Sequence, residues 1–239
     1  MKQFLTLNDL QNFDAQVALA KEIKANPYQY EELGKRKTLG LLFFNPSLRT
    51  RLSTQKAGRL LGMDVMVMNF SNEAWAIEYE DKTIMEGLRS EHVKEAAQVV
   101  SQYCDVVGIR AFATLTDKEK DESEQVLQKF IQYASVPILN MESATAHPLQ
   151  ALADALTLTE LSLPKKPKVV LTWAPHPKAL PHAVGNSFAR MMEHQDADFV
   201  IANPEGYDLD PRITKDIPVV HNQAEALKGA DVVYAKNWS

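Results

Sequence analysis

The chain has 239 residues, a formal net charge of -5 at pH 7 and one cysteine, and each of these values excludes some class of protein. The length is too great for one small domain and comfortable for two. The negative charge gives no reason to expect nucleic acid or an anionic membrane as a partner. The one cysteine, Cys104, excludes an internal disulfide framework, and its helical apolar surroundings predict a buried structural thiol. With no signal-peptide pattern and no apolar run long enough to span a bilayer, we expect a cytoplasmic protein.

Apolar periodicity predicts helices and strands that alternate along the chain. In order, we expect helix Leu7–Ala25, strand Leu39–Phe44, helix Arg49–Leu61, strand Asp64–Phe70, helix Glu91–Tyr103, strand Asp105–Arg110, helix Glu122–Tyr133 and strand Val136–Met141. There follow helix Pro148–Leu161, strand Lys168–Trp173, helix Leu180–Glu193, strands Asp198–Ala202 and Ile217–His221, helix Gln223–Leu227 and strand Asp231–Ala235. Most of Ser71–Ser90 has weak periodicity and is expected to be loop. The alternation predicts an α/β fold with parallel sheets.

A proline-flanked segment, Pro164-Lys-Lys-Pro167, predicts the seam between two doubly wound parallel-sheet domains. We expect residues 1–146 to form the first domain, residues 147–163 a linking helix and residues 164–239 the second domain. The last predicted strand is followed only by Lys236-Asn-Trp-Ser239, without the helix that usually covers such a strand. We therefore expect the second domain to be incomplete at its C-terminus.

The junction between the first strand and the helix Arg49–Leu61 predicts an anion-binding site. Asn45-Pro46 ends the strand and Ser47 is a good N-cap, so free backbone N–H groups and the positive end of the helix dipole converge there. Arg49 and Arg51 oppose that dipole unless an anion is present, and they add donors suited to a phosphate. The alternative is an ordinary capped helix with solvated arginines. We favour the anion site, although the sequence contains neither a Walker P-loop nor a G-x-G-x-x-G motif.

Polar side chains also stand at the ends of two later predicted strands, where an open parallel sheet forms its ligand crevice. Arg110 closes one strand; a charge there is costly to bury unless it is paired or holds an anion, and a surface salt bridge is the alternative. His147-Pro148-Leu149-Gln150 follows the next strand and opens a helix. The His can donate to an oxygen, and the Gln carbonyl one turn later can accept from a nitrogen of a small planar group. A capping histidine is the alternative for His147.

These segments resemble a known enzyme family. Pro46-Ser-Leu-Arg-Thr-Arg51 resembles the Ser-Thr-Arg-Thr-Arg carbamoyl-phosphate motif of aspartate and ornithine carbamoyltransferases, with Leu48 in place of the usual Thr. His147-Pro-Leu-Gln150 resembles their His-Pro-x-Gln motif, and Ala153-Asp-Ala-Leu-Thr157 resembles the segment that comes next in those enzymes. The resemblance covers essentially the whole chain. It implies that an amine attacks the carbonyl carbon of carbamoyl phosphate and phosphate leaves, which requires charge stabilisation and alignment more than a nucleophilic side chain.

The family resemblance assigns roles to the residues of these motifs. It implies that the phosphate is bound by Ser47, Leu48, Arg49, Thr50 and Arg51. It implies that Arg110 and His147, with Thr50, polarise the carbonyl group and that Gln150 holds the carbamoyl NH2. The first domain would then bind carbamoyl phosphate and the second the amino substrate. No metal or organic cofactor is implied.

The chain departs from ordinary ornithine carbamoyltransferases in ways that indicate the amino substrate. Those enzymes carry Asp-x-x-x-Ser-Met-Gly after the last strand, where the Asp pairs with the α-ammonium of ornithine. Here Lys236 stands in that neighbourhood; it would repel an ammonium and can bind a carboxylate or an amide oxygen. Their Gly-Asp-x-x-Asn pattern is replaced by Trp173-Ala-Pro-His-Pro-Lys178. These departures, together with Asn140-Met-Glu142, resemble the N-acyl-ornithine carbamoyltransferases.

The N-acyl-ornithine branch implies further site residues. It places Glu142, His176 and Lys236 on the acylated ornithine. It also places Trp75, from a loop of the neighbouring subunit in a homotrimer, on carbamoyl phosphate. Taken singly, Trp75 is also consistent with a loop anchor, and His176 with a turn residue beside two prolines.

The acyl group is indicated by one position. In the N-acetyl enzymes a glutamate just ahead of a Glu-His pair faces the acyl group, and this chain has Ser90 there, before Glu91-His92. An acid would repel the terminal carboxylate of a succinyl group, whereas a serine can donate a hydrogen bond to it. We therefore expect carbamoyl transfer to the δ-amine of N-succinyl-L-ornithine, in arginine biosynthesis. The alternatives are N-acetyl-L-ornithine, then free ornithine, and, in a different class, a catalytically silent phosphate-binding regulatory paralogue.

Overall fold

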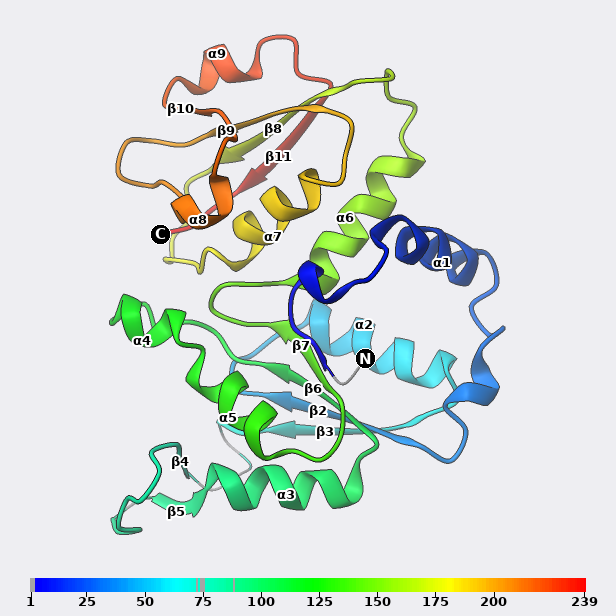
Figure 1. Ribbon diagram of the computed structural model, residues 1–239, viewed down its shortest axis with the longest axis vertical. Helices are drawn as coiled ribbons and strands as arrows, with labels where there is room; N and C mark the ends of the chain where they lie inside the picture. The colour runs from blue at the N-terminus through cyan, green and yellow to red at the C-terminus, as the bar shows by residue number, and fades with distance from the viewer. Residues whose placement is uncertain (1–2, 72, 74–75, 88) are drawn as a thin grey trace.

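The structure is a computed structural model that describes residues 3–71, 73, 76–87 and 89–239, and Figure 1 shows its two main sheets one above the other. The lower sheet has five parallel strands in the order β1-β7-β6-β2-β3. Its strands are β1 (Gln3–Phe4), β2 (Thr38–Phe43), β3 (Asp64–Asn69), β6 (Val106–Arg110) and β7 (Ile138–Glu142). The upper sheet has four parallel strands in the order β10-β9-β8-β11. Its strands are β8 (Lys168–Trp173), β9 (Asp198–Ala202), β10 (Val219–Val220) and β11 (Val232–Lys236).

Helices cover both faces of each sheet, as expected for a doubly wound α/β fold. The longer helices are α1 (Phe13–Ala25), α2 (Arg49–Leu60), α3 (Val93–Tyr103), α5 (Gln125–Tyr133), α6 (Pro148–Glu160) and α7 (Ala183–Met192). Because side chains alternate along a strand, β2 sends Leu41 and Phe43 to one face and Leu42 to the other, where Leu42 packs with α3 and α5. In β8, Val170 likewise packs opposite to Leu171, in a cluster with α9 (Gln223–Leu227). The two-sheet α/β prediction is confirmed.

The N-terminal segment connects the two sheets. Its strand β1 pairs with β7 in the lower sheet. However, Leu7 and Phe13 are buried in the same apolar cluster as Leu171 and Phe188 of the upper sheet and its helix α7. The helix α6 runs between the two sheets in Figure 1 and packs on both α1 and α7. The cluster therefore holds the upper sheet against the first 25 residues and α6.

Local signals set the helix ends, and several predicted ends are wrong. The helix predicted from Leu7 is a short 3-10 turn followed by α1 from Phe13, because the Asn12 side chain accepts a hydrogen bond from Ala15 N at 2.9 Å and caps the helix there. The helix predicted over residues 122–133 begins only at the start of α5, because Glu124 before it adopts a φ of 49°, and the short helix α4 (Lys118–Glu122) that precedes it was not predicted. The helix predicted from residue 180 begins three residues later, at the start of α7.

The loop predicted over Ser71–Ser90 is wrong in part. It contains β4 (Ala76–Glu78) and the start of β5 (Arg89–His92), which pair in a small parallel sheet. The next helix, α3, consequently begins at Val93 rather than Glu91, with the His92 ring accepting a hydrogen bond from Lys94 N at 3.1 Å. The short elements β1 and α8 (Pro211–Thr214) were not predicted.

A close approach explains the glycine in strand β2. A Cβ at Gly40 would lie 2.6 Å from the Cys104 sulfur, so only glycine leaves room for that side chain. Cys104 is buried, as the sequence predicts. Its burial raises the pKa of its thiol, and the nearby charge of Asp105 raises it further.

Within the described residues, the structure has no helix that is both long and apolar enough to cross a membrane.

Candidate active site

Charged side chains from four elements meet at the carboxyl ends of the strands. Arg110 ends β6, Glu142 ends β7, Arg49 begins α2 and Lys236 ends β11. Glu142 interacts electrostatically with the three cations, so both sheets contribute to one cluster. His147 joins the cluster as the residue before α6. Crevices at this edge of parallel sheets are the usual ligand sites of open α/β folds.

Arg110 and Glu142 form a buried ion pair at the centre of this cluster. The pairing of β6 with β7 is irregular after Ile109, and this shift sets Arg110 opposite Glu142 instead of Met141. Arg110 Nε donates to Glu142 Oε2 at 3.2 Å, and Nη2 lies 3.0 Å from the same oxygen. Arg110 is 6% exposed, so the surface salt bridge considered for it is wrong. Burial raises the pKa of Glu142, and Arg110 opposes that rise.

The remaining donors of Arg110 are almost all occupied. Its Nη1 donates to the backbone oxygens of Asn45 at 3.2 Å and Pro46 at 2.8 Å, and its guanidinium lies 4.0 Å from the centre of the Phe112 ring. A guanidinium has five N–H donors, so the described residues leave one Nη2 N–H for a ligand. Asn45 Oδ1 also accepts from Phe112 N at 2.6 Å. These bonds fix the turn that precedes α2 to the end of β6.

His147 is partly buried, and its lowered pKa keeps it neutral at pH 7. Burial, then the charges of Arg110 and Lys236, lower the pKa of His147 to about 4. Its Nε2 lies 3.6 Å from Glu142 Oε2, and its Nδ1 is buried without a hydrogen bond to any residue that the structure describes. The ring makes no capping hydrogen bond to α6, so the capping histidine considered from the sequence is wrong. A neutral imidazole with an unpaired nitrogen can serve a bound ligand.

We expect His147 to make the fold sensitive to acid. The unfolded chain takes up a proton near pH 6.5, whereas the folded chain does so only near pH 4, so the free energy of unfolding falls as pH drops through this window. The shift corresponds to about 3 kcal/mol in total. Urea unfolding at pH 7 and pH 4.5 should show a clearly smaller loss for His147→Asn than for the unchanged protein. Equal losses in the two proteins would show that His147 does not carry this effect.

The loop between Glu142 and His147 is held by residues that sequence reasoning missed. Glu124 Oε1 accepts hydrogen bonds from Thr145 N at 2.9 Å, from Thr145 Oγ1 at 2.7 Å and from Ser143 Oγ at 2.5 Å. From the other side, α7 supplies Ser187 and Asn186, which bond His147 N at 2.7 Å and Thr145 O at 3.1 Å. No local sequence signal marks these contacts, because they join segments about 20 to 40 residues apart. They hold the loop that ends at His147 between Glu124 and the helix α7.

The predicted anion site is an open cavity of about 470 Å³ beside the start of α2, lined by Asn45, Pro46, Ser47, Leu48, Arg51, Asn69 and Ser71. Leu48 takes the N-cap position of α2 in place of Ser47, although Ser47 Oγ still accepts from Thr50 N at 3.3 Å. Arg51 donates to Asn69 Oδ1 and lies 5.3 Å from the centre of the Phe43 ring. Arg49 is exposed and makes no hydrogen bond or ion pair with another described residue. A cluster of donors thus surrounds an opening that an anion can enter.

The other predicted site residues lie in different surroundings, and not all of them join the charged cluster. Gln150 lies on the first turn of α6 and donates to Asp154 Oδ1 at 2.8 Å. Burial lowers the pKa of Lys236. The charge of Glu142 opposes this decrease in pKa, and the charge of Arg49 adds to it. His176 lies on the exposed loop after β8, where its Nδ1 accepts from Lys178 N at 3.1 Å, and it is not joined to the central cluster by a hydrogen bond or ion pair among the described residues.

The small β4–β5 sheet lies apart from the cluster. Ser90 is exposed on β5, which Figure 1 places at the bottom of the molecule, away from the region between the two main sheets. The structure therefore does not bring Ser90 to Lys236 within one chain. Trp75 lies outside the described residues.

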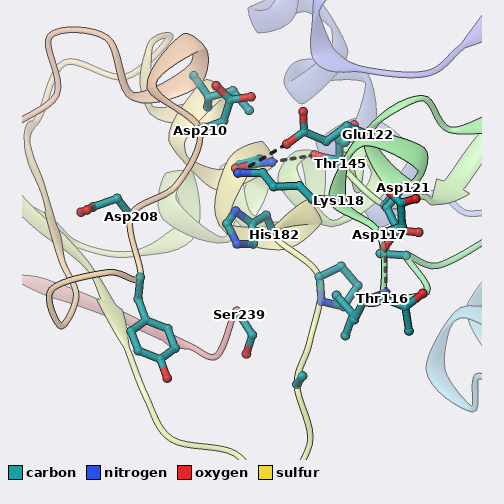
Figure 2. Close-up of a pocket in the computed structure, with 18 of the residues that line it drawn as sticks. Thr116, Asp117, Lys118, Asp121, Glu122, Thr145, His182, Asp208, Asp210 and Ser239 are labelled. Carbon is teal, nitrogen blue, oxygen red and sulfur yellow. Dashed lines mark hydrogen bonds and ion pairs between the residues drawn. The ribbon is translucent and has the colours of Figure 1, made fainter.

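A second cavity, of about 490 Å³, opens between the two sheets next to the cluster. Figure 2 shows Lys118, Glu122 and Thr145 to one side of His182 and Asp208 to the other. Most of the carboxylates that line this cavity already have partners. Arg212, for example, forms ion pairs with Asp210 and with Glu122, and the distance to Glu122 is 2.9 Å. This cavity adjoins the charged cluster through Thr145 but contains none of the cluster residues. Among the described residues, no group of three or more His, Cys, Asp or Glu side chains could hold a metal ion.

Comparisons with known proteins agree with these motifs. A family model described as "Aspartate/ornithine carbamoyltransferase, carbamoyl-P binding domain" matches residues 2–160. N-succinylornithine carbamoyltransferase of Bacteroides thetaiotaomicron is 48% identical over 239 residues, which cover all of this chain and 75% of that protein. N-acetylornithine carbamoyltransferase of Xanthomonas campestris is 38% identical over all of this chain and 74% of that protein. The chain thus spans about three quarters of the length of these relatives.

Solved structures show the same architecture. One is N-acetyl-L-ornithine transcarbamylase with a glutamate-to-serine substitution, complexed with carbamyl phosphate and N-succinyl-L-norvaline. It is similar to this chain with a TM-score of 0.92 and 38% identity, covering all of this chain and 76% of that one. Acetylornithine transcarbamylase complexed with acetylcitrulline gives a TM-score of 0.92 and 38% identity, covering all of this chain and 75% of that one.

Proposed function

Because this chain belongs to the aspartate/ornithine carbamoyltransferase family, we propose that it transfers the carbamoyl group of carbamoyl phosphate to the δ-amine of N-succinyl-L-ornithine. The products are N-succinyl-L-citrulline and phosphate, as a step of arginine biosynthesis. The observation that carries the choice of an acylated amine is Lys236 at the end of β11, within the electrostatic reach of Glu142 and Arg49. A cation at this position disfavours the free α-ammonium of ornithine and suits a carboxylate or amide oxygen.

The chemistry depends on the donors around the cluster. Arg49, Arg51 and the backbone N–H groups at the start of α2 bind the phosphate, helped by the hydroxyls of Ser47 and Thr50. The amine attacks the carbonyl carbon, and the carbonyl oxygen becomes an oxyanion as the tetrahedral intermediate forms. The remaining N–H of Arg110 and the neutral ring of His147 stabilise that oxyanion in a site where their charges and dipoles are already fixed. Gln150 holds the carbamoyl NH2. Phosphate then leaves with the electron pair of the broken C–O bond and takes up the proton that the attacking amine loses.

The succinyl group is supported by Ser90. A serine beside the acyl group accommodates a terminal carboxylate that a glutamate would repel. Consistent with this, a glutamate-to-serine form of N-acetyl-L-ornithine transcarbamylase has been solved in complex with N-succinyl-L-norvaline. Two relatives named N-succinylornithine carbamoyltransferase, at 48% and 47% identity, are also more similar to this chain than four N-acetylornithine carbamoyltransferases at 35–39%.

The position of β5 supports a shared site. Because Ser90 lies away from Lys236 within one chain, it reaches an acyl group only in the site of a neighbouring subunit. Trp75 comes from the same part of the chain and contacts carbamoyl phosphate in that neighbouring site. The assembly is a homotrimer. A solution mass of three chains by light scattering on the intact protein supports this arrangement, and a monomer that is fully active contradicts it.

Replacing Ser90 by glutamate tests the acyl assignment. We expect kcat/KM for N-succinyl-L-ornithine to fall by roughly 100-fold, because a like charge set against the succinyl carboxylate costs a few kcal/mol. The value for N-acetyl-L-ornithine should stay the same or rise. Ser90→Ala is the matched control, since it removes the hydroxyl without adding charge, and it should retain most of the activity on the succinyl substrate. An unchanged preference in Ser90→Glu would contradict the role of this position.

A further inference from the structure

Asp154 lies one helical turn after Gln150 on α6 and is not accounted for by the reaction described above. Gln150 Nε2 donates to Asp154 Oδ1 at 2.8 Å. The Tyr234 hydroxyl, on β11 of the upper sheet, interacts with the same carboxyl group. The carboxyl group is half-buried, so it stands between the helix that carries Gln150 and the strand that ends in Lys236.

The chemistry of this contact fixes which way the Gln150 amide faces. An ionised carboxylate has only acceptors, so the group that Gln150 turns toward Asp154 must be its NH2. The oxygen and nitrogen of a side-chain amide stand on opposite sides of one planar carbon, so committing the nitrogen to Asp154 leaves Gln150 Oε1 on the other side. Among the described residues, the one side-chain hydrogen bond of Gln150 is this donation from Nε2, so Oε1 has no partner there.

We propose that Asp154 is a positioning residue that holds the Gln150 amide with its carbonyl oxygen toward the ligand, so that Gln150 selects the NH2 of the carbamoyl group. The proposal rests on the proposed function, because it takes the role of Gln150 from there. An amide that is free to flip would present its own NH2 to the carbamoyl NH2 in part of the molecules, and two donors repel. Asp154 prevents that flip because the carboxylate oxygens would repel the amide oxygen.

An ordinary i,i+4 pair on a helix surface would also place Gln150 beside Asp154, and such pairs contribute only about 0.2–0.5 kcal/mol to a helix. Two features distinguish the pair here. It is half-buried, and a second donor reaches the carboxyl group from Tyr234, two residues before Lys236. Burial raises the pKa of Asp154, and its interactions with Gln150 and Tyr234 oppose that rise.

A double-mutant cycle on the intact protein tests the proposal. The four proteins are the unchanged chain, Asp154→Asn, Gln150→Met and the double variant. Asparagine keeps the shape of aspartate but both accepts and donates, so it no longer selects one orientation of the Gln150 amide. We expect Asp154→Asn to lower kcat/KM for carbamoyl phosphate by about 10-fold, whereas in the Gln150→Met background it should change this value by less than about twofold. Methionine has no amide to orient.

The cycle separates positioning from a structural role. If Asp154 only stabilised α6, Asp154→Asn would lower activity by the same factor in both backgrounds, and that result overturns the proposal. Full activity of Asp154→Asn alone overturns it as well. Unchanged kcat/KM in Gln150→Met would instead contradict the role given to Gln150 under the proposed function. Absence of carbamoyl transfer in the unchanged protein would contradict the proposed function itself, and binding of carbamoyl phosphate measured by calorimetry would then replace kcat/KM in the same cycle.

Discussion

Replacing Arg110 by methionine is expected to remove measurable carbamoyl transfer and to destabilise the protein by about 3–5 kcal/mol. The protein loses stability because Glu142 would remain buried without its partner. Glu142 can then escape part of the cost by taking up a proton, and burial already raises its pKa. The folded state would then bind this proton more tightly than the unfolded state, so the destabilisation should grow as pH rises. Urea unfolding at pH 5 and pH 8 measures this trend.

The double variant Arg110→Met with Glu142→Met separates the two effects. Removing both charges leaves neither one unpaired, and replacing a buried ion pair by apolar groups is often neutral for stability. We expect the double variant to recover most of the stability lost by Arg110→Met while remaining inactive, because the donor to the oxyanion is still absent. A double variant as unstable as the single one would contradict the pairing. One that regained activity would contradict the catalytic role of Arg110.

Replacing Arg49 by glutamine should produce effects of opposite sign on function and stability. Arg49 is the first residue of α2, is exposed and has no hydrogen-bond or ion-pair partner among the described residues, so only its longer-range attraction to Glu142 offsets its unfavourable interaction with the helix dipole. Its loss should leave stability unchanged or raise it by about 0.3–1 kcal/mol. A lost charge-assisted hydrogen bond to the phosphate is worth about 1.5–3 kcal/mol, so kcat/KM for carbamoyl phosphate should fall by roughly 10- to 100-fold.

Arg59 in the last turn of α2 offers a matched control for Arg49. There a cation complements the helix dipole, so Arg59→Gln should lower stability slightly and leave the reaction unaffected. Thermal unfolding and steady-state kinetics of both variants compare the two ends of the same helix. If Arg49→Gln lost stability and kept its activity, Arg49 would be a structural residue and the anion site would lose its main support.

The part of the fold that is encoded locally could be predicted well from the sequence. The strand predicted over residues 39–44 is β2, which begins and ends one residue earlier. Its end could be predicted because Asn45-Pro46 ends the extended run. The following helix ends before Gly62, whose φ of 75° suits glycine. The small β4–β5 sheet could not be predicted. Its strands are too short to show an alternating apolar pattern, and their pairing joins residues about 13 positions apart in the sequence.

The candidate site was also predictable only where its residues lie in local sequence motifs. Motifs placed Arg110 and His147 at strand and helix ends, but the burial of Arg110 against Glu142 depends on the register shift between β6 and β7. Glu124 had no signal at all, because a left-handed backbone at a glutamate is not expected from its propensity. Ser90 and Lys236 were predicted to meet on one substrate, and the separation of their elements in one chain became visible only in three dimensions.

A competition assay on the intact protein tests the central claim most directly. Carbamoyl phosphate would be supplied with equal concentrations of N-succinyl-L-ornithine, N-acetyl-L-ornithine and L-ornithine, and the three citrulline products would be resolved by mass spectrometry. We predict that N-succinyl-L-citrulline dominates. A dominance of N-acetyl-L-citrulline would contradict the assignment carried by Ser90, and a dominance of free citrulline would contradict the assignment carried by Lys236.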